Sequence, residues 1–345
     1  LTARAALAVG SCIIFLVVAG WAEVFAPLWQ WGWLAGSATF VILGVGFAAA
    51  VLVEMRLVTL RRWRMVVGRS AVAALARLVL VVPLALGIFD GNLALWLFLI
   101  AALPISTSGY VLVLYTRMTC DHQDRLLPQR PRNLDSIMRF ATVNWVGLVA
   151  TQGPIFAIPL LVAFSVDSAD NAPFYVAWSF GAMAFLLPQT IGQVTLSEAN
   201  YDGQLSNKLI HGLKLALLLT CVASFFAQLT GGFIADLYGP GYEELSFFIP
   251  LVVAASIPWS YTSLGLTASR IREHHGEVLF VSVFHFTTTM VPALILTPLY
   301  GAEAAVWCWV AGNTATALVV AMMYLRWKLD PENALVRSSV DARVS

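Results

Sequence analysis

Ten apolar runs, each about as long as a membrane-spanning helix, limit what this chain can fold into more than any other feature. A helix needs about 20 mostly apolar residues to cross the hydrocarbon core of a bilayer. Runs of this kind lie at 5–25, 33–54, 71–89, 92–115, 138–165, 174–197, 209–228, 246–268, 277–298 and 304–325. They are continuous, whereas the strands of an outer-membrane barrel alternate over about ten residues. The sequence therefore predicts an all-α integral membrane protein of about ten transmembrane helices.

The composition agrees with a lipid environment. Of the 345 residues, 59% are hydrophobic and 11% are charged, whereas a soluble domain carries about 25% charged residues. So few charges cannot supply the polar surface that a water-soluble fold of this size requires. We therefore expect most side chains to face lipid or other helices.

The basic residues predict which side of the membrane each connector faces. With residue 1 inside, the inner segments collect almost every Lys and Arg, including five arginines in RLVTLRRWRMVVGR (56–69). The outer connectors PLWQWGW, FDGN, VDSADNAP, TGGFIADLYGPGYEE and YGAE contain none. Because cytoplasmic loops carry an excess of basic residues, we expect a multi-pass protein of the cytoplasmic (plasma) membrane with both termini cytoplasmic. The arginine run then fixes topology and contacts anionic lipids, and we expect no nucleic-acid partner, which would require a solvated basic face.

No motif in the sequence indicates catalysis or metal binding. The chain has no Gly-rich phosphate loop, no GxSxG and no HExxH, and its four cysteines have no paired spacing. Membrane enzymes that assemble glycans on the outer face would be expected to keep basic and acidic groups in a sizeable outer loop, which this sequence lacks. We therefore expect no enzyme, no catalytic residue, no metal and no cofactor.

One basic residue lies inside a predicted span. Arg77, in SAVAALARLVLVV, is about two turns from the cytoplasmic end of the third span. Long basic side chains near a span end can extend to the headgroups. The alternative is that Arg77 faces a central cavity and pairs with an anionic ligand such as a phosphate.

Two further spans carry polar side chains at helical spacing. Asn144 and Thr151 are seven residues apart and share a helical face with Gln152 beside it, and Gln189 and Gln193 are four residues apart on one face. Interhelical hydrogen bonding would explain each of these positions. A substrate cavity would also explain them, so the predicted substrate-binding residues are Arg77, Asn144, Gln152, Gln189 and Gln193.

His285 and Asn313 are single polar positions in the last two spans, where bonding between helices is the simpler reading. No span centre carries Asp or Glu, so no proton relay is evident. Prolines interrupt several spans: Pro83, Pro104, Pro154, Pro159, Pro188, Pro250, Pro258 and Pro292. Broken helices are common where a bundle lines a cavity or rocks, which favours a transporter over a passive scaffold.

Three stretches carry a family resemblance: ADLYGPGYEELSFFIPLVVAASIPWSYTSLGLTASRIREHH (235–275), TPLYGAEAAVWCWVAGNTATALVVAMMYLRW (297–327) and MRFATVNWVGLVATQG (138–153). The first resembles the C-terminal lobe of polysaccharide flippases in the multidrug/oligosaccharidyl-lipid/polysaccharide (MOP) exporter superfamily. The second is similar to the run leading into a late helix of those proteins. The third, with the basic connector before it, is similar to their junction between two lobes.

The resemblance implies a two-lobe transporter. Such proteins usually have twelve or more spans in two six-helix lobes. Aligned by its loops, this chain supplies an N-terminal lobe of four helices at 1–116, a cytoplasmic connector at 117–137, a C-terminal lobe of six helices at 138–325 and a cytoplasmic tail at 326–345. The first hairpin of the family is then unaccounted for, and since the chain begins with Leu1 we expect an incomplete sequence.

The function that follows is flipping of a lipid-linked oligosaccharide or polysaccharide precursor across the cytoplasmic membrane by alternating access. The expected partners are that lipid-linked glycan, membrane lipids and glycan-assembly proteins. A multidrug or metabolite exporter of the same fold is the alternative, although a cation exporter should carry acids in its cavity. A membrane-embedded glycan-assembly enzyme or scaffold is a third reading.

Overall fold

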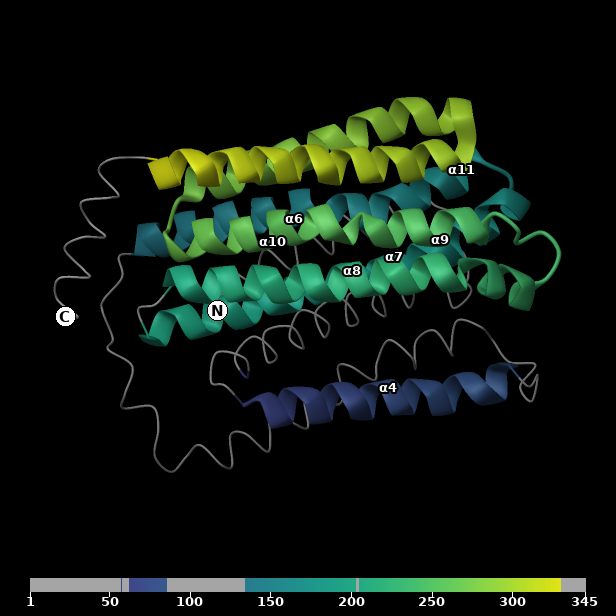
Figure 1. The fold of residues 1–345 in the computed structure, drawn as a ribbon, viewed down its shortest axis with the longest axis horizontal. Coiled ribbons are helices and arrows are strands. Elements are labelled where there is room, and N and C mark those ends of the chain that lie inside the picture. Colours follow the sequence, from purple (N-terminus) through teal and green to yellow (C-terminus); the bar gives the residue numbers. More distant parts are fainter. Residues whose placement is uncertain (1–56, 58–61, 86–133, 203–204, 330–345) are drawn as a thin grey trace, which may run out of the picture. The chain divides into compact units, whose positions relative to one another are not determined.

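A computed structural model describes residues 57, 62–85, 134–202 and 205–329, and within them every regular element is an α-helix (Figure 1). The all-α prediction is therefore confirmed. The predicted spans at 5–25, 33–54 and 92–115 lie outside the described residues. The chain divides into two compact units, Leu1–Arg130 and Pro131–Ser345. The limits predicted for the lobes, connector and tail stay predictions.

The described part of the first unit is dominated by one helix, α4 (Trp63–Ala85). It begins inside the arginine run and continues through most of the third predicted span. Arg64 lies in its first turn and is exposed, as are the apolar side chains of Val67, Val72 and Leu75. Exposed apolar side chains along one helix are what lipid contact requires.

The second unit consists of α6 (Leu134–Ser165), α7 (Ser168–Asp202), α8 (Leu205–Tyr238), α9 (Leu245–Ala254), α10 (Ser256–Ile271) and α11 (His275–Leu329). Apart from α9 and α10, which continue in one direction, successive helices of this unit run antiparallel (Figure 1). Five described stretches are long and apolar enough to cross a membrane: Thr142–Ser165, Ala169–Leu196, Asn207–Tyr238, Leu245–Ile271 and His275–Arg326. Large apolar side chains such as Phe164, Phe233 and Leu299 are each more than two-thirds exposed. The chain is a multi-pass membrane protein.

Helix α11 is two helices joined at Gly301. An unbroken helix of 55 residues would be about 80 Å long at 1.5 Å per residue, far more than the ~30 Å hydrocarbon core. Gly301 has φ 75° and ψ −160°, a backbone conformation essentially restricted to glycine. Pro298 lies three residues earlier, and Figure 1 shows the chain turning back at this bend. The two halves correspond to the predicted spans 277–298 and 304–325.

A proline accounts for the break between α9 and α10. Pro258 has no backbone N–H, so it cannot donate to the carbonyl of Ala254, where α9 ends. Ala255 bridges the two helices with helical φ and ψ of −61° and −16°. The pair α9–α10 therefore forms a single bent span.

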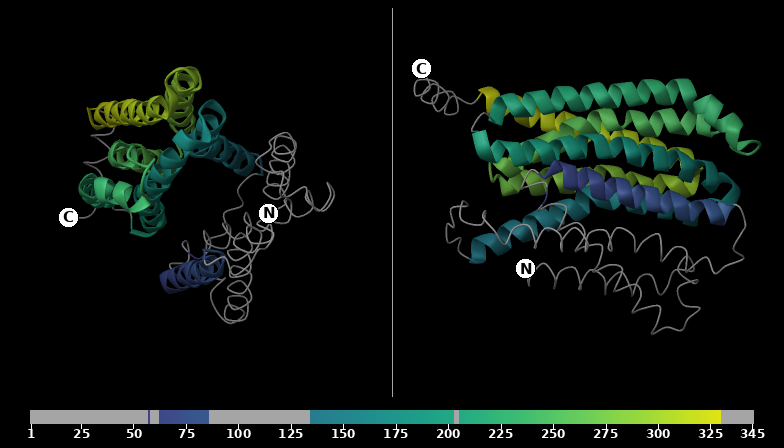
Figure 2. Two further views of the ribbon diagram at one scale, coloured as in Figure 1. Left: turned by 90° about the vertical axis from the view of Figure 1, so that its right-hand side faces the viewer. Right: turned by 90° about the horizontal axis from the view of Figure 1, so that it is seen from below.

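The core of the second unit is aromatic. The Trp309 ring lies 5.0 Å from Trp178 and 4.9 Å from Phe185, and Phe185 lies 5.8 Å from Trp259. These side chains come from α7, α10 and the second half of α11. Trp178 also donates from Nε1 to the Ile155 carbonyl at 3.0 Å, which ties α7 to α6. Figure 2 (left) shows α10, in green, between α8 and the yellow second half of α11, and both pack against it.

Candidate functional site

The residues predicted to bind substrate occupy three helices. Arg77 lies in α4, in the first unit, and its side chain is outside the described part of the structure. Asn144 and Gln152 lie in α6 and are half-buried. Gln189 and Gln193 lie in α7, where Gln189 is half-buried and Gln193 is exposed. The four amide residues therefore lie on two neighbouring helices of one unit, which is the only way in which the described structure brings them together.

The depth of these residues follows from the turn at 166–167 that joins α6 to α7. Asn144 and Gln189 are equally far from that turn along the sequence, so an antiparallel pair places them at about the same depth. Thr151, which shares the helical face of Asn144, is buried and donates to the Gly147 carbonyl of its own helix at 2.8 Å. Its hydroxyl proton is therefore used within α6.

A close contact with α10 positions the polar segment of α7. Ser263 donates from Oγ to the Pro188 carbonyl at 3.1 Å. One turn on, Gly192 lies so close to α10 that a Cβ there would be 2.8 Å from Thr267 Oγ1. Gln189 directly follows Pro188 and Gln193 directly follows Gly192, so this contact sets the position of both amides.

His285 and Asn313 are buried in the core of the second unit. The His285 ring lies 5.2 Å from the Trp259 ring, and its Nδ1 is 3.4 Å from Thr316 Oγ1. Thr316 donates its only hydroxyl proton to the Gly312 carbonyl at 2.7 Å, so His285 donates from Nδ1 to Thr316. Asn313 donates from Nδ2 to the Trp309 carbonyl at 2.8 Å. His285 therefore links the two halves of α11, as the simpler interpretation predicts, whereas the Asn313 bond lies within its own helix.

Sequence reasoning missed an acidic pocket at the opposite end of the unit from the turn between α10 and α11. It has a volume of about 450 Å³ and is lined by Asp170, Glu244 and Glu303 together with apolar and aromatic groups around Gly301. The three carboxylates come from the starts of α7, α9 and the second half of α11. All three belong to connectors predicted to face outward, and that shared location was the only clue in the sequence to their meeting.

The pocket affects the protonation of its carboxylates. Burial raises the pKa of Glu244, and the negative charges of Asp170, Glu303 and Glu243 raise that pKa further. The neighbouring Glu243 behaves in the opposite way, because backbone N–H groups hydrogen-bond its carboxylate and lower its pKa. The Gly241 N–H, at 3.1 and 3.2 Å from its two oxygens, is one of these donors. Adjacent glutamates therefore have opposite tendencies to bind a proton.

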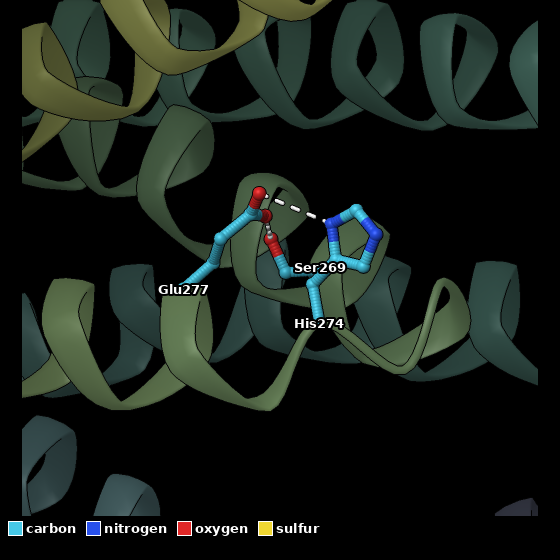
Figure 3. A network of polar contacts seen from close by, with 3 residues as sticks. All are labelled: Ser269, His274 and Glu277. Carbon is cyan, nitrogen blue, oxygen red and sulfur yellow. Dashed lines mark hydrogen bonds and ion pairs between the residues drawn. The ribbon is translucent and has the colours of Figure 1, made fainter. Parts of the chain in front are cut away.

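At the opposite end of the unit, three side chains form a polar network at the turn between α10 and α11 (Figure 3). Ser269 donates from Oγ to Glu277 Oε2 at 2.8 Å, and His274 Nδ1 lies 3.1 Å from Glu277 Oε1. Glu273, within the turn, has a positive φ of 58°. Arg270 and Arg272 flank this turn, so the network stiffens a connector predicted to face the cytoplasm.

Comparison with known proteins identifies the fold. No protein-family model matches the chain, and no curated protein matches it. Among solved structures, an outward-facing multidrug resistance MATE family transporter of the MOP superfamily is similar with a TM-score of 0.61 and 13% identity, over 93% of this chain and 75% of that one. The fold is that of MOP superfamily transporters.

A second solved structure supports the same assignment. MATE in complex with MaL6 is similar with a TM-score of 0.60 and 16% identity, over 86% of this chain and 69% of that one. The MOP fold predicted from the sequence is therefore confirmed. The polysaccharide-flippase subtype stays a prediction, because both structures are of MATE transporters.

Proposed function

We propose that this chain moves a lipid-linked oligosaccharide or polysaccharide precursor across the cytoplasmic membrane. The distribution of polar groups along the described spans carries the proposal. Their acids, Asp170, Asp236, Glu277 and Glu303, all lie near helix ends or at the Gly301 bend, whereas the interiors of α6 and α7 carry neutral amides. Amides and hydroxyls match the hydroxyl groups of a sugar better than they match a cationic drug.

The physical need for such a protein is clear. A glycan headgroup with a phosphate linker would lose its hydrogen bonds to water in about 30 Å of hydrocarbon. A MOP-fold protein can hold the headgroup in a hydrated cavity while the lipid tail stays in the bilayer. Rocking of two lobes would then expose that cavity to the other side.

Each predicted site residue has a role in this proposal. Arg77 attracts the phosphate of the lipid carrier, and Asn144, Gln152, Gln189 and Gln193 hydrogen-bond the sugars. Replacing Arg77 with Ala should abolish most transport, whereas Arg77→Lys should retain part of it, because Lys keeps the charge. Arg64→Ala is the matched control, since it removes an exposed arginine from the first turn of the same helix. Full transport by Arg77→Ala would remove the phosphate role.

The cellular test follows the lipid-linked oligosaccharide on each face of the membrane. Cells depleted of the full-length gene product should accumulate it on the cytoplasmic face, and re-expression should reverse the accumulation. Unchanged sidedness would contradict the flippase proposal. The partners expected in such cells are the lipid-linked glycan, membrane lipids and glycan-assembly proteins.

An exporter of cationic compounds is the second candidate, and the acidic pocket is the observation that favours it. Asp170, Glu244 and Glu303 surround a space of about 450 Å³, and carboxylates attract organic cations. One of the similar solved structures is described as a multidrug resistance transporter. Increased sensitivity to toxic cations on depletion, with normal glycan sidedness, would select this function instead.

A further inference from the structure

An apolar groove of about 370 Å³ lies on the second unit, near the start of α8 and the ends of α10 and α11. One wall is α8, with Leu213, and the other is the last part of α11, with Tyr324. The floor is α10, where Gly265 and Ala268 present little side-chain volume. Arg272, just after α10 ends, also lines the groove.

Helix packing explains why the groove exists. Helices α8 and α11 both pack against α10, but within the described residues they do not contact each other. Gly265 lets the α11 wall approach closely, since a Cβ there would collide with the side chain of Val320. The groove is therefore a gap between two helices over the small residues of a third.

The length of the groove matches one leaflet of a bilayer. From Tyr261 to Arg272 along α10 is about 16 Å at 1.5 Å per residue. The hydrocarbon core is about 30 Å thick, so one leaflet contributes about 15 Å. An acyl chain lying along α10 would start at the level of Arg272 and end near the middle of the membrane.

Charge selects the class of lipid. Arg272 lies at the helix-end side of the groove, and Lys214 and Arg326, each the residue after a groove-lining leucine, are both exposed. Basic side chains beside a membrane surface attract anionic headgroups.

A second groove in the same unit provides an internal comparison. It also has a volume of about 370 Å³, lies between α7, α8 and α9, and has Ala223 and Phe226 among its lining residues. Its lining contains no charged residue. The two grooves are thus equal in size and differ in charge.

We propose that the groove lined by Arg272 binds one anionic phospholipid of the leaflet predicted to be cytoplasmic. The phosphate pairs with Arg272, and one acyl chain lies over Gly265 and Ala268. The site is formed entirely by the second unit and is separate from the residues proposed to bind the transported substrate.

The test uses the purified, delipidated full-length protein and native mass spectrometry, with dioleoylphosphatidylglycerol and dioleoylphosphatidylcholine as probes. The wild type should bind one phosphatidylglycerol in preference to phosphatidylcholine. Arg272→Gln should reduce that preference about fivefold, the effect of about one basic residue at a membrane surface, and Arg272→Lys should keep it. Ala268→Phe should block binding by filling the groove, whereas Ala223→Phe, which fills the uncharged groove, should leave the preference unchanged.

A photoactivatable phosphatidylglycerol locates the lipid independently of these variants. The proposal expects crosslinks concentrated on 209–213 and 320–325. Labelling spread evenly over the lipid-facing helices, or an unchanged preference in Arg272→Gln, would overturn it. Binding that appears only after removal of 330–345 would also overturn it, by showing that the chain's own tail fills the groove.

Discussion

At the scale of single residues, two adjacent glutamates at the acidic pocket show how local surroundings shift the pKa of identical side chains in opposite directions. Glu243 and Glu244 are neighbours in sequence, yet backbone N–H groups lower the pKa of Glu243 while burial and nearby carboxylates raise the pKa of Glu244. A proton therefore binds Glu244 before Glu243 as the pH falls. This difference gives the acidic pocket a carboxyl group whose pKa lies above its ordinary value.

We expect Asp170→Asn or Glu303→Gln to lower the pKa of Glu244, because each removes a negative charge that raises it. Ionising Glu244 in the fold costs more than ionising it in the unfolded chain. Its contribution to stability therefore falls as the pH rises from the ordinary carboxyl value through the raised one. Carboxyl ¹³C shifts measured against pH would check this, with Asp236→Asn as the control. An unmoved Glu244 titration in both variants would contradict the described pocket.

The buried pair His285 and Thr316 gives a second prediction at this scale. Thr316→Val leaves the Nδ1–H of a fully buried His285 without its acceptor, so we expect a loss of about 1–3 kcal/mol of stability. In a His285→Phe background the same change should cost clearly less, because no donor is left unpaired. Thermal unfolding of the four proteins in a double-mutant cycle measures this difference. Equal costs in the two backgrounds would show that the contact contributes nothing.

At the scale of helices, small residues set the distances between neighbours. A Cβ at Gly312 would collide with both the side chain and the backbone of Thr289, whereas a Cβ at Gly232 would meet nothing within 4 Å. We expect Gly312→Ala to destabilise the protein by about 1–3 kcal/mol through overpacking. Gly232→Ala, at an exposed position in α8, should stabilise it by about 0.5–1 kcal/mol. Unfolding in a mild detergent would compare the two, and a harmless Gly312→Ala would contradict the close packing of the two halves of α11.

The helices were also the most predictable level of the structure. Twenty-residue apolar runs located the spans of the second unit, because length and hydropathy alone decide which helices can cross a bilayer. The bend at Gly301 was predicted only as a connector between spans. Its glycine-specific conformation depends on how the chain must turn there, which periodicity does not report.

The candidate site was less predictable than the spans, because polarity alone does not show which residues meet in space. Polarity identified Asn144, Gln152, Gln189 and Gln193 as residues that needed a partner, and the structure places them on α6 and α7. Their role as ligands stays a prediction, as does that of Arg77. The acidic pocket was missed because three connectors had to meet in space before their charges formed one feature.

At the scale of the whole molecule, three features bear on the substrate. The chain is a multi-pass membrane protein with the fold of MOP superfamily transporters. The second unit has an acidic pocket at one end and, at the other, the turn flanked by Arg270 and Arg272. Neutral amides occupy the span interiors between these ends. This arrangement suits a substrate with a phosphate linker and a sugar headgroup. It therefore supports the proposed function, which is to move a lipid-linked glycan across the membrane.

The most direct test of that function is transport by the purified full-length protein in liposomes. A lipid-linked oligosaccharide is placed in one leaflet, and its arrival in the other is measured with a lectin or glycosidase that cannot cross the membrane. We predict protein-dependent movement of the glycan lipid that is lost in Arg77→Ala, and no movement of a cationic dye. Transport of the dye without the glycan lipid would contradict the proposed function and identify an exporter.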